Sequence, residues 1–377
     1  MTQKLGKRVA LGLSGGVDSA LSAHLLKEAG YDVTAVFLEC WRAPGCRTDQ
    51  DRKDALAVAL QLELPFQVLD FKETYRQKVV EYFFAEYAAG RTPNPDVMCN
   101  REIKFGLFYD WAMDNGFDYV ATGHYAQSFC TQQPLQLGKV TEQLSPLIAA
   151  KDAHKDQTYF LYLLRREQFD HILFPVGHLT KPEVRAEAVK RGIPVAAKKD
   201  SVGICFIGDI NVHSFLKERL GENPGQVVDT QGNVIGEHKG LWFYTVGQRH
   251  GFSILPKTLV KNADGEEVDR HTLPPFYVIR KNPSKNQLIV GFGAETETDQ
   301  FAILEPHWLT ALPPASQQLL VRIRHTGELL PAKLIEAQGS YAVQLEHAVA
   351  GVAAGQSAVF YVQQDQNLAC IGGGIIA

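Results

Sequence analysis

The chain has 377 residues, of which 45% are hydrophobic and 21% are charged, and its formal net charge is -4. This length predicts two or three globular domains, and the near balance of charge excludes binding to nucleic acid or membranes by bulk attraction. No run of about 18 apolar residues occurs, and Met1 to Lys4 lead into an apolar segment without a signal-peptide core. We therefore expect a cytoplasmic protein that makes no membrane contact.

The cysteines do not form a disulfide framework, because they are few for a chain of this length. Reduced thiols are expected at all six positions, which are Cys40, Cys46, Cys99, Cys130, Cys205 and Cys370. The closest pair, Cys40 and Cys46, has five residues between its members, which is too wide for an ordinary zinc knuckle, and no second pair follows. We expect no metal site there, and a zinc ion is the less favoured alternative.

A glycine-rich turn follows the first apolar run, Arg8 to Leu13, and a helical pattern begins at Val17 and stops at Gly30. Such a turn places backbone N-H groups beside a helix N-terminus, which suits an oligophosphate. Its spacing is neither that of the Gly-Lys-Ser/Thr ATP-binding loop nor that of the dinucleotide fingerprint, and no lysine stands at its end. A tight turn without a ligand is the alternative.

Strands and helices alternate after this turn. Val33–Leu38 and Phe66–Phe71 read as buried strands, Tyr119–Tyr125 as another, and helices are expected over 51–62 and 72–89. This order predicts an α/β fold, a doubly wound and mainly parallel sheet, with its ligand site at the carboxyl ends of the strands.

Residues 91–100 contain two prolines, which we expect to forbid a helix until about Arg101. Cys99 would then lie near a helix N-terminus with Arg101 and Lys104 beside it, an environment that favours the thiolate. The alternative is a cysteine that serves as a small buried hydrophobe.

The remainder divides into further segments. Residues 127–146 are polar and irregular, and Leu147–Ala150 is expected to return to the parallel sheet. Cys205 stands in a glycine-flanked loop, and residues 212–251 carry the turn signals of a small module. After Pro275 short alternating strands predict a β-barrel. The expected domains are 1–207, 208–273 and 274–377. Arg322 and Arg324 alternate along one expected strand, which predicts that both side chains point to the same face.

Several motifs, taken together, resemble those of the bacterial tRNA-specific 2-thiouridylases, a family of pyrophosphate-loop enzymes. They are Gly12–Ser19, Gly90–Asp96 with Cys99 and Asn100, Ala121–Tyr125, Lys155–Gln157, Gly203–Gly208 and Gly355–Tyr361. The resemblance implies an adenine nucleotide alpha hydrolase-like domain, a small central module and a barrel that contacts tRNA. It also implies thiolation at C2 of the wobble uridine, position 34, in tRNAs of the Lys, Glu and Gln type. ATP and Mg²⁺ would serve the reaction, and a cysteine desulfurase or a sulfur-carrier protein would supply persulfide sulfur.

The resemblance also implies roles for individual residues. Cys99 would be the nucleophile, Cys205 the persulfide carrier and Asp96 the group that transfers a proton. ATP would be held by Gly12, Leu13, Ser14, Gly15, Gly16, Val17, Asp18, Ser19, Leu38 and Gly123. Asn94, Pro95 and Asp96 would contact the flipped-out uridine, and tRNA would be met by His124, Lys155, Asp156, Gln157, Arg324, His325 and Gln356. The chain departs from the family pattern at His325, where a tyrosine is usual, and at Leu38, where methionine is usual.

Three alternatives stay open at this point. Another pyrophosphate-loop ligase would need neither Cys99 nor Cys205. A non-enzymatic RNA-binding module would release no pyrophosphate when RNA is added. An iron-sulfur cluster held by both cysteines and a nearby carboxylate would replace persulfide chemistry, although two cysteines are fewer than the usual four.

Overall fold

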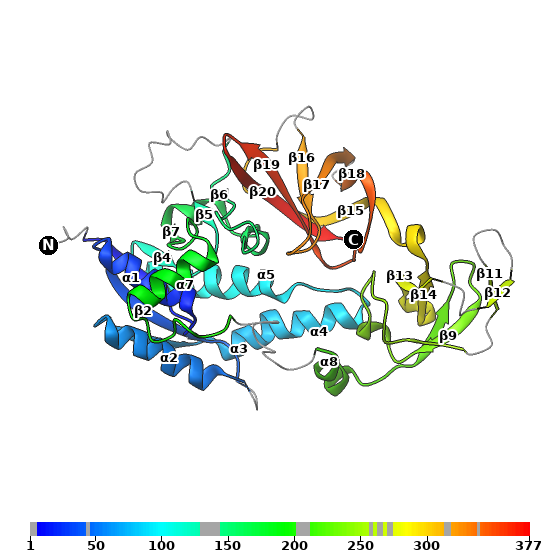
Figure 1. The fold of residues 1–377 in the computed structure, drawn as a ribbon, viewed down its shortest axis with the longest axis horizontal. Helices are drawn as coiled ribbons and strands as arrows, with labels where there is room; N and C mark the ends of the chain where they lie inside the picture. The colour runs from blue at the N-terminus through cyan, green and yellow to red at the C-terminus, as the bar shows by residue number, and fades with distance from the viewer. Residues whose placement is uncertain are drawn as a thin grey trace.

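The computed structural model describes residues 6–42, 46–128, 144–200, 212–255, 259–261, 267–269, 274–312, 318–337 and 340–377. A parallel sheet with its helices stands at one end, a small module of strands at the other, and a barrel lies above the helices that join them (Figure 1). None of the helices in these ranges is long and apolar enough to cross a membrane.

The N-terminal sheet has five parallel strands in the order β3-β2-β1-β4-β7. Their bounds are β1 Arg8–Gly12, β2 Asp32–Glu39, β3 Phe66–Asp70, β4 Tyr119–Ala121 and β7 Ile172–Leu173. The order reverses between β1 and β4, so the turn after β1 opens at the switch point where such sheets bind ligands. The expected α/β fold with a doubly wound parallel sheet is confirmed.

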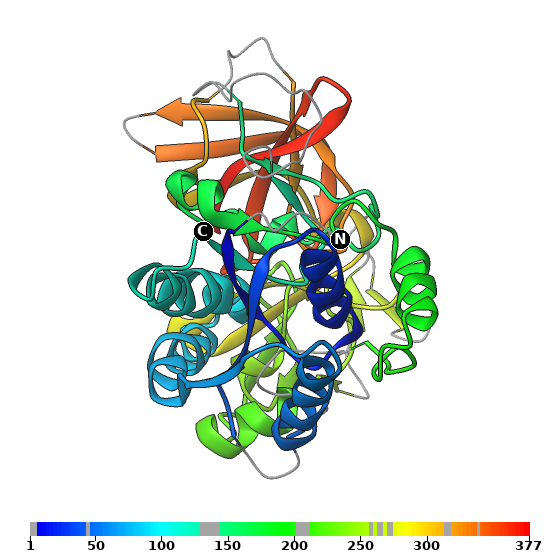
Figure 2. The ribbon, with the colours of Figure 1, turned by 90° about the vertical axis from the view of Figure 1, so that its left-hand side faces the viewer.

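Helices cover both faces of this sheet (Figure 2). One face packs against α1 (Val17–Glu28), α2 (Thr48–Gln61) and α7 (Lys181–Lys190), and the other packs against residues of the helix that ends with α6 (Phe108–Asp114). Because both faces are covered, the first strand reads as a continuous apolar run, in which Val9, Ala10 and Leu11 are completely buried.

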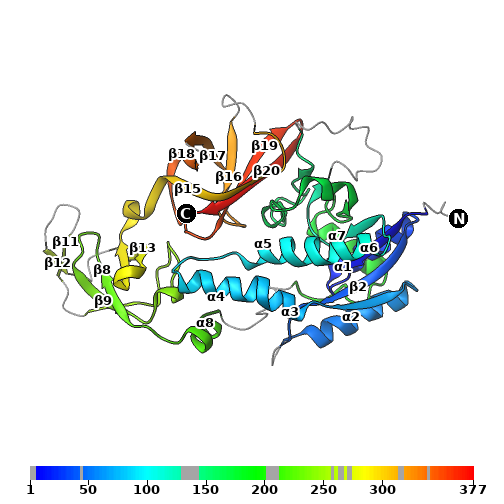
Figure 3. The ribbon, with the colours of Figure 1, turned by 180° about the vertical axis from the view of Figure 1, so that it is seen from behind.

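Two long helices run side by side from the parallel sheet toward the small module (Figures 1 and 3). The first comprises α3 Lys72–Tyr75, the π-helical η1 Arg76–Val80 and α4 Glu81–Ala88, and the second comprises α5 Pro95–Cys99, the π-helical η2 Asn100–Leu107 and α6. The expectation that the prolines forbid a helix before Arg101 is wrong. Pro95 occupies the first helical turn, where its missing N-H costs nothing, and the Asn94 side chain caps the helix by accepting from Val97 N at 3.3 Å.

The small module begins with α8 (Val212–Leu220) and contains a sheet in the order β10-β9-β8-β14-β13. The bounds are β8 Gly225–Val228, β9 Val234–His238, β10 Ser253–Ile254, β13 Tyr277–Asn282 and β14 Gln287–Gly291, and β11 Leu259–Lys261 pairs separately with β12 Glu267–Asp269. We expected β13 and β14 in the barrel, but β14 pairs with β8 instead. The domain boundary at residue 274 stays a prediction. Both strands lie after residue 274 in the sequence but belong to the sheet of the small module.

The C-terminal strands form a six-stranded antiparallel barrel, closed by pairing between β15 and β20. They are β15 Glu297–Trp308, β16 Leu319–Arg322, β17 Leu330–Ala337, β18 Ser340–Ala350, β19 Ser357–Gln364 and β20 Asn367–Ile376. The expectation that Leu147–Ala150 returns to the parallel sheet is wrong, because β6 (Leu147–Ile148) pairs with β20 and with β5 (Gln127–Ser128). This pairing joins the barrel to the N-terminal domain through backbone hydrogen bonds.

Candidate active site

The loop Gly12–Ser19 is a compact turn closed by its own hydroxyl groups. Ser14 N donates to Ser19 Oγ at 3.2 Å, and Ser19 Oγ donates to the Gly16 carbonyl at 3.1 Å. Gly15 has φ +77°, and a Cβ there would lie 2.2 Å from the Asp51 carbonyl oxygen at the start of α2. A side chain at this position is therefore excluded both by its backbone conformation and by the neighbouring helix.

Gly123 brings the segment after β4 directly onto the start of α1. A Cβ at Gly123 would lie 2.6 Å from Ser19 N. The resemblance implies that Gly123 holds ATP, and the structure adds that this glycine lets two loop backbones meet. Leu38 is partly buried near the carboxyl end of β2, the strand beside β1. The residues predicted for ATP thus gather at one edge of the sheet.

A lysine from a distant helix reaches the loop. Lys181, in the first turn of α7, places Nζ at 2.8 and 2.9 Å from the two carboxylate oxygens of Asp18. Tyr125 also donates its hydroxyl to Asp18 Oδ1 at 2.7 Å. Sequence reasoning found no lysine at the end of the loop and missed this one, because it lies 163 positions away. The one local signal was that Lys181 lies in the first turn of a helix, which the capping box of Thr180 and Glu183 and the proline at 182 indicate.

Asp200 collects three cations beside this pair. Lys181, Lys155 and Arg185 place nitrogens at 2.9, 2.8 and 2.6 Å from its carboxylate. Partial burial opposes ionisation, but hydrogen bonds from Lys155 and Lys181 outweigh it and lower the pKa of Asp200 to about 2. Asp200 is therefore ionised at neutral pH and holds the three cations at the edge of the loop. Sequence reasoning assigned Lys155 to tRNA and gave Asp200 no role.

Lys198 forms a second cationic contact with the loop. Its Nζ donates to the Gly15 carbonyl at 2.9 Å and to Asp51 Oδ1 at 2.7 Å, and it also pairs with Asp54. Lys198 therefore fastens the loop to α2.

Cys99 lies in the second turn of its helix and is 3% exposed. Burial raises the pKa of the Cys99 thiol to about 12, although Lys104 acts in the opposite direction. The expectation that the environment of Cys99 favours the thiolate is therefore wrong, because the raised pKa keeps the thiol neutral. Its physical reason is that the helix begins at Pro95, which removes Cys99 from the N-terminal positions and places it in an apolar cluster with Met98 and Ile103.

Two side-chain oxygens on this helix are buried without a hydrogen-bond partner in the described ranges. They are Asp96 Oδ1 and Asn100 Oδ1, which lie four positions apart and therefore on one side of the helix. A buried acceptor without a donor is costly in a folded protein and requires an explanation. Asn100 belongs to the same sequence motif as Cys99, but no role was predicted for it.

The predicted tRNA residues 156 and 157 are occupied within the protein. Asp156 is 3% exposed and accepts hydrogen bonds from Arg322 Nη1 at 2.9 Å, from Thr158 Oγ1 and from Ala150 N. Gln157 Oε1 accepts from Tyr125 N at 2.9 Å. Their side chains thus fasten the segment rather than present it to solvent.

Gln356 and His325 also make contacts within the chain. Gln356 Nε2 donates to the carbonyl of Thr92 at 2.9 Å and to that of Pro93 at 3.3 Å. His325 Nε2 donates to the Asp156 carbonyl at 3.1 Å. Both barrel residues therefore hold segments of the N-terminal domain next to Asn94 and Gln157.

The expectation that Arg322 and Arg324 share a face is wrong. Strand β16 ends at Arg322, which is 8% exposed, whereas the chain turns after it and leaves Arg324 exposed. Arg324 lines a cavity of about 340 Å³ that also borders Gln356 and Gly247. Arg324 is thus placed where a ligand from solvent could reach it, and Arg322 is not.

His124 is a buried neutral imidazole. Burial first, and then Lys104, lower its pKa well below the usual range. Lys104 Nζ donates to Nε2 at 3.5 Å, so the ring proton lies on Nδ1 and is shared with Thr122 Oγ1 at 2.8 Å. This contact joins the helix that carries Cys99 to the loop that carries Gly123.

Cys205 lies outside the described residues, and so does the rest of segment 201–211. Within the described ranges, no three His, Cys, Asp or Glu side chains are grouped so that they could hold a metal ion. The described residues thus provide a glycine-rich loop at the switch point of the parallel sheet, a buried thiol and two unpaired acceptors.

Three family models match successive parts of the chain. Residues 7–209 match the tRNA methyl transferase HUP domain, residues 213–292 the tRNA methyl transferase PRC-barrel domain, and residues 298–376 the aminomethyltransferase beta-barrel domain. The fold and the site therefore define an enzyme of the ATP-using HUP-domain class.

Full-length relatives specify the family. The chain is 41% identical over 386 residues to the tRNA-specific 2-thiouridylase MnmA of Streptococcus thermophilus, covering 100% of this chain and 96% of the relative. It is 41% identical to the MnmA of Lactococcus lactis subsp. cremoris, with 98% and 94% covered. The chain belongs to the tRNA-specific 2-thiouridylase family, which confirms the resemblance seen in its motifs. The U34-tRNA thiolase NcsA of Methanococcus maripaludis shares 20% identity over 58% of this chain and 64% of its own, with a TM-score of 0.35, which carries no functional argument.

Proposed function

We propose that the chain catalyses ATP-dependent 2-thiolation of the wobble uridine, position 34, in tRNAs of the Lys, Glu and Gln type. The observation that carries the proposal is the pair of unpartnered oxygens, Asp96 Oδ1 and Asn100 Oδ1, on the helix of the buried Cys99. A uracil offers an N-H donor at N3 between two carbonyl oxygens. A flipped-out uracil would supply the donor that Asp96 lacks, and the Asn100 amide, once turned, would donate to a uracil carbonyl.

The first step is adenylation. Uracil O2 attacks the α-phosphorus of ATP, and pyrophosphate leaves. Adenylation is needed because an oxygen of uracil is by itself a poor leaving group. The loop Gly12–Ser19 presents backbone N-H groups and a helix N-terminus to the phosphates, and Lys181 and Lys155 supply positive charge at its edge. When phosphates enter, Lys181 exchanges part of its contact with Asp18 for a phosphate oxygen.

The second step is sulfur transfer. The terminal sulfur of a persulfide on Cys205 attacks C2 of the adenylated base, and AMP leaves with the former O2. The Cys99 sulfur then bonds to that of Cys205 as the persulfide S-S bond breaks, so the product carries the transferred sulfur and the enzyme carries a disulfide. A thiol reductant then converts the disulfide back to two thiols by thiol–disulfide exchange, and a cysteine desulfurase or a sulfur-carrier protein transfers a new persulfide sulfur to Cys205.

Cys99 must lose its proton for this step, because its thiol is neutral in the resting protein. Asp96 is one helical turn away, and its charge contributes to the raised pKa of Cys99. We propose that the Asp96 carboxylate accepts the proton once the base is bound. Storing the thiol in its neutral form protects it from oxidation between turnovers.

Mg²⁺ fits the loop mainly through the phosphates of ATP, since the described residues offer no ready three-ligand cluster. Asp18, which belongs to the loop, is the carboxylate that would hold the ion or its water. The ion would offset the negative charge that develops on pyrophosphate.

An in vitro reconstitution tests the proposal. The protein is mixed with Mg·ATP, a cysteine desulfurase, cysteine and an unmodified tRNA transcript with uridine at position 34, and 2-thiouridine and AMP are measured by mass spectrometry. We expect both in equal amounts. Formation of AMP without a thiolated base would favour another pyrophosphate-loop ligase, and absence of pyrophosphate release with tRNA present would favour a binding module.

Cys205→Ser separates the two steps. This variant should release pyrophosphate on mixing with ATP and tRNA but form no 2-thiouridine, because adenylation needs no thiol. Cys46→Ser is the matched control and should retain both activities, since Cys46 is partly exposed and contacts Thr48 Oγ1 at 3.4 Å, a contact that a serine hydroxyl can also make. Full thiolation by Cys205→Ser would overturn the persulfide assignment. Iron and acid-labile sulfide in anaerobically purified protein would favour a cluster instead.

A further inference from the structure

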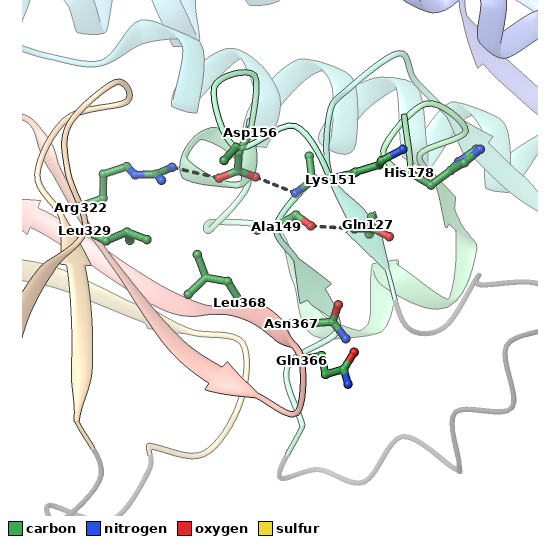
Figure 4. Close-up of a pocket in the computed structure, with 12 residues that line it drawn as sticks. Gln127, Ala149, Lys151, Asp156, His178, Arg322, Leu329, Gln366, Asn367 and Leu368 are labelled. Carbon is green, nitrogen blue, oxygen red and sulfur yellow. Dashed lines mark hydrogen bonds and ion pairs between the residues drawn. The ribbon is translucent and has the colours of Figure 1, made fainter. Parts of the chain in front are cut away.

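A cavity of about 480 Å³ lies at the seam between the N-terminal domain and the barrel, and neither the loop Gly12–Ser19 nor Cys99 lines it. Figure 4 shows Lys151 and His178 on the side of the N-terminal domain and Arg322 on the side of the barrel. Gln366 comes from the turn between β19 and β20, and Asn367 is the first residue of β20. The two domains thus enclose a space that neither could form alone.

The lining of this cavity favours an anion. Lys151, His178 and Arg322 line it, and Asp156 is the one carboxylate among the described lining residues. The Asp156 oxygens already accept hydrogen bonds from Arg322, Thr158 and Ala150, and Arg322 neutralises their charge. Asp156 should therefore repel a bound anion only weakly. Lys151 is the remaining cation of the lining, and its partner Glu183 is not a lining residue. His178 adds an imidazole that can donate.

The reachable cation is held loosely. Lys151 Nζ contacts both Glu183 oxygens at 2.7 and 2.9 Å, and the two side chains are 50% and 44% exposed. An exposed ion pair is weak and exchanges readily for another anion. Arg322 is tightly held, but its Nε is buried without a hydrogen-bond partner in the described ranges, so its donor capacity is not filled within that part of the protein.

The remaining polar groups suit a sugar-phosphate chain better than a base. The Gln366 and Asn367 amides can donate to phosphate or to ribose hydroxyls. Among the described lining residues there is no Phe, Tyr or Trp, and the one ring is the imidazole of His178, so a base would find little surface on which to stack. On the side of the N-terminal domain, Gln127 and the small apolar residues Ala149, Ala150 and Ala153 also line the wall.

We propose that this cavity, which we call the seam cavity, is a subsite for a phosphate group of the tRNA backbone, separate from the place where the base reacts. The inference rests on the proposed function, because it takes tRNA as the substrate. One segment links the two places. Five residues of the segment 149–157 line the seam cavity, namely Ala149, Ala150, Lys151, Ala153 and Asp156. The same segment contains Lys155, which contacts Asp200 at 2.8 Å, and Gln157, which holds Tyr125 at the loop.

The test places a negative charge in the seam cavity. Asn367→Asp should weaken tRNA binding several-fold at low salt, with the difference shrinking as salt increases, because a carboxylate repels the bound phosphate. Gln363→Glu is the matched control, since it adds the same charge to an exposed position of β19 that does not line the cavity. Binding is measured by fluorescence anisotropy of labelled tRNA without ATP, and ATP affinity should be equal in all three proteins.

A second variant and a second readout keep the inference testable if Asn367→Asp folds poorly. Lys151→Ala should lower the slope of log K against log salt by about one unit, because a lysine that contacts a phosphate displaces about one counterion. Phosphate-ethylation interference should then lose a protected position on the tRNA.

Three results would overturn the inference. Equal tRNA affinity of Asn367→Asp and wild type at low salt would remove RNA from the seam cavity. An equal loss in Gln363→Glu would show a bulk charge effect. If inorganic phosphate or UMP binds and tRNA does not displace it, the occupant of the seam cavity would be a free small ligand and not tRNA. Each can occur while wild-type protein still thiolates tRNA, so failure here is distinguishable from failure of the proposed function.

Discussion

Lys181 Nζ lies 2.8 Å from Asp18 Oδ1 and 2.9 Å from Asp200 Oδ1. One ammonium group therefore joins the start of α1, where Asp18 lies, to Asp200. The Lys181 side chain is 11% exposed. A cation so placed can neutralise the loop while it is empty and bind phosphate when ATP enters.

Lys181→Met should therefore slow tRNA-dependent pyrophosphate release. The loss should be about 10²-fold, the size typical of removing one donor that stabilises developing charge. Lys190→Met, at the exposed end of the same helix, is the control and should be near wild type. An unchanged rate for Lys181→Met in folded protein would assign this lysine to structure alone.

Cys99 should react slowly with iodoacetamide at pH 8, because its pKa is raised to about 12 by burial. Mass spectrometry of peptides should show Cys40 and Cys46, which are partly exposed, labelled first. The raised pKa also sets the sign of a stability effect. The contribution of Cys99 is complete below the unfolded pKa of about 8.5 and is lost as pH rises toward 12, because the unfolded chain releases this proton first. Rapid labelling of Cys99 at pH 8 without substrate would contradict the buried thiol.

Arg322→Met should destabilise the protein by about 3–5 kcal/mol, because it leaves the Asp156 carboxylate buried without its cation. Urea denaturation followed by tryptophan fluorescence measures the loss. Lys333→Met, at an exposed position of β17, should change stability by less than about 0.5 kcal/mol. Adding Asp156→Asn to Arg322→Met should recover part of the loss. A double variant as unstable as the sum of both single variants would show that the pair is not coupled.

Arg324→Ala should weaken the binding of all substrate tRNAs alike and lower the salt slope by about one unit, because it removes one exposed phosphate contact. ATP binding should not change. Lys333→Ala, elsewhere on the barrel, is the control. If tRNA affinity is the same for Arg324→Ala and wild type at low and moderate salt, the cavity beside Gln356 is not part of the RNA interface.

The sequence by itself determined the parallel sheet, the loop between β1 and α1, the presence of a C-terminal barrel and the family, because each depends on local patterns. A short apolar run predicts a strand, and apolar residues at helical spacing predict a helix, from neighbouring residues alone. Gly15 has a positive φ that favours glycine, which is also a local property. The same local reasoning failed at Pro95, where two prolines suggested a break, although proline is well suited to the first turn of a helix.

Only the tertiary structure decided which partners the charged residues have. Lys181 and Asp18 are 163 positions apart, Arg322 and Asp156 are 166 apart, and each pairing exists because a sheet edge or a barrel strand brings the two side chains together. The pKa of Cys99 was decided in the same way, since burial among residues of several helices outweighs its local basic neighbours. Electrostatic interactions depend on distance in space and on the surrounding dielectric, and sequence spacing gives neither.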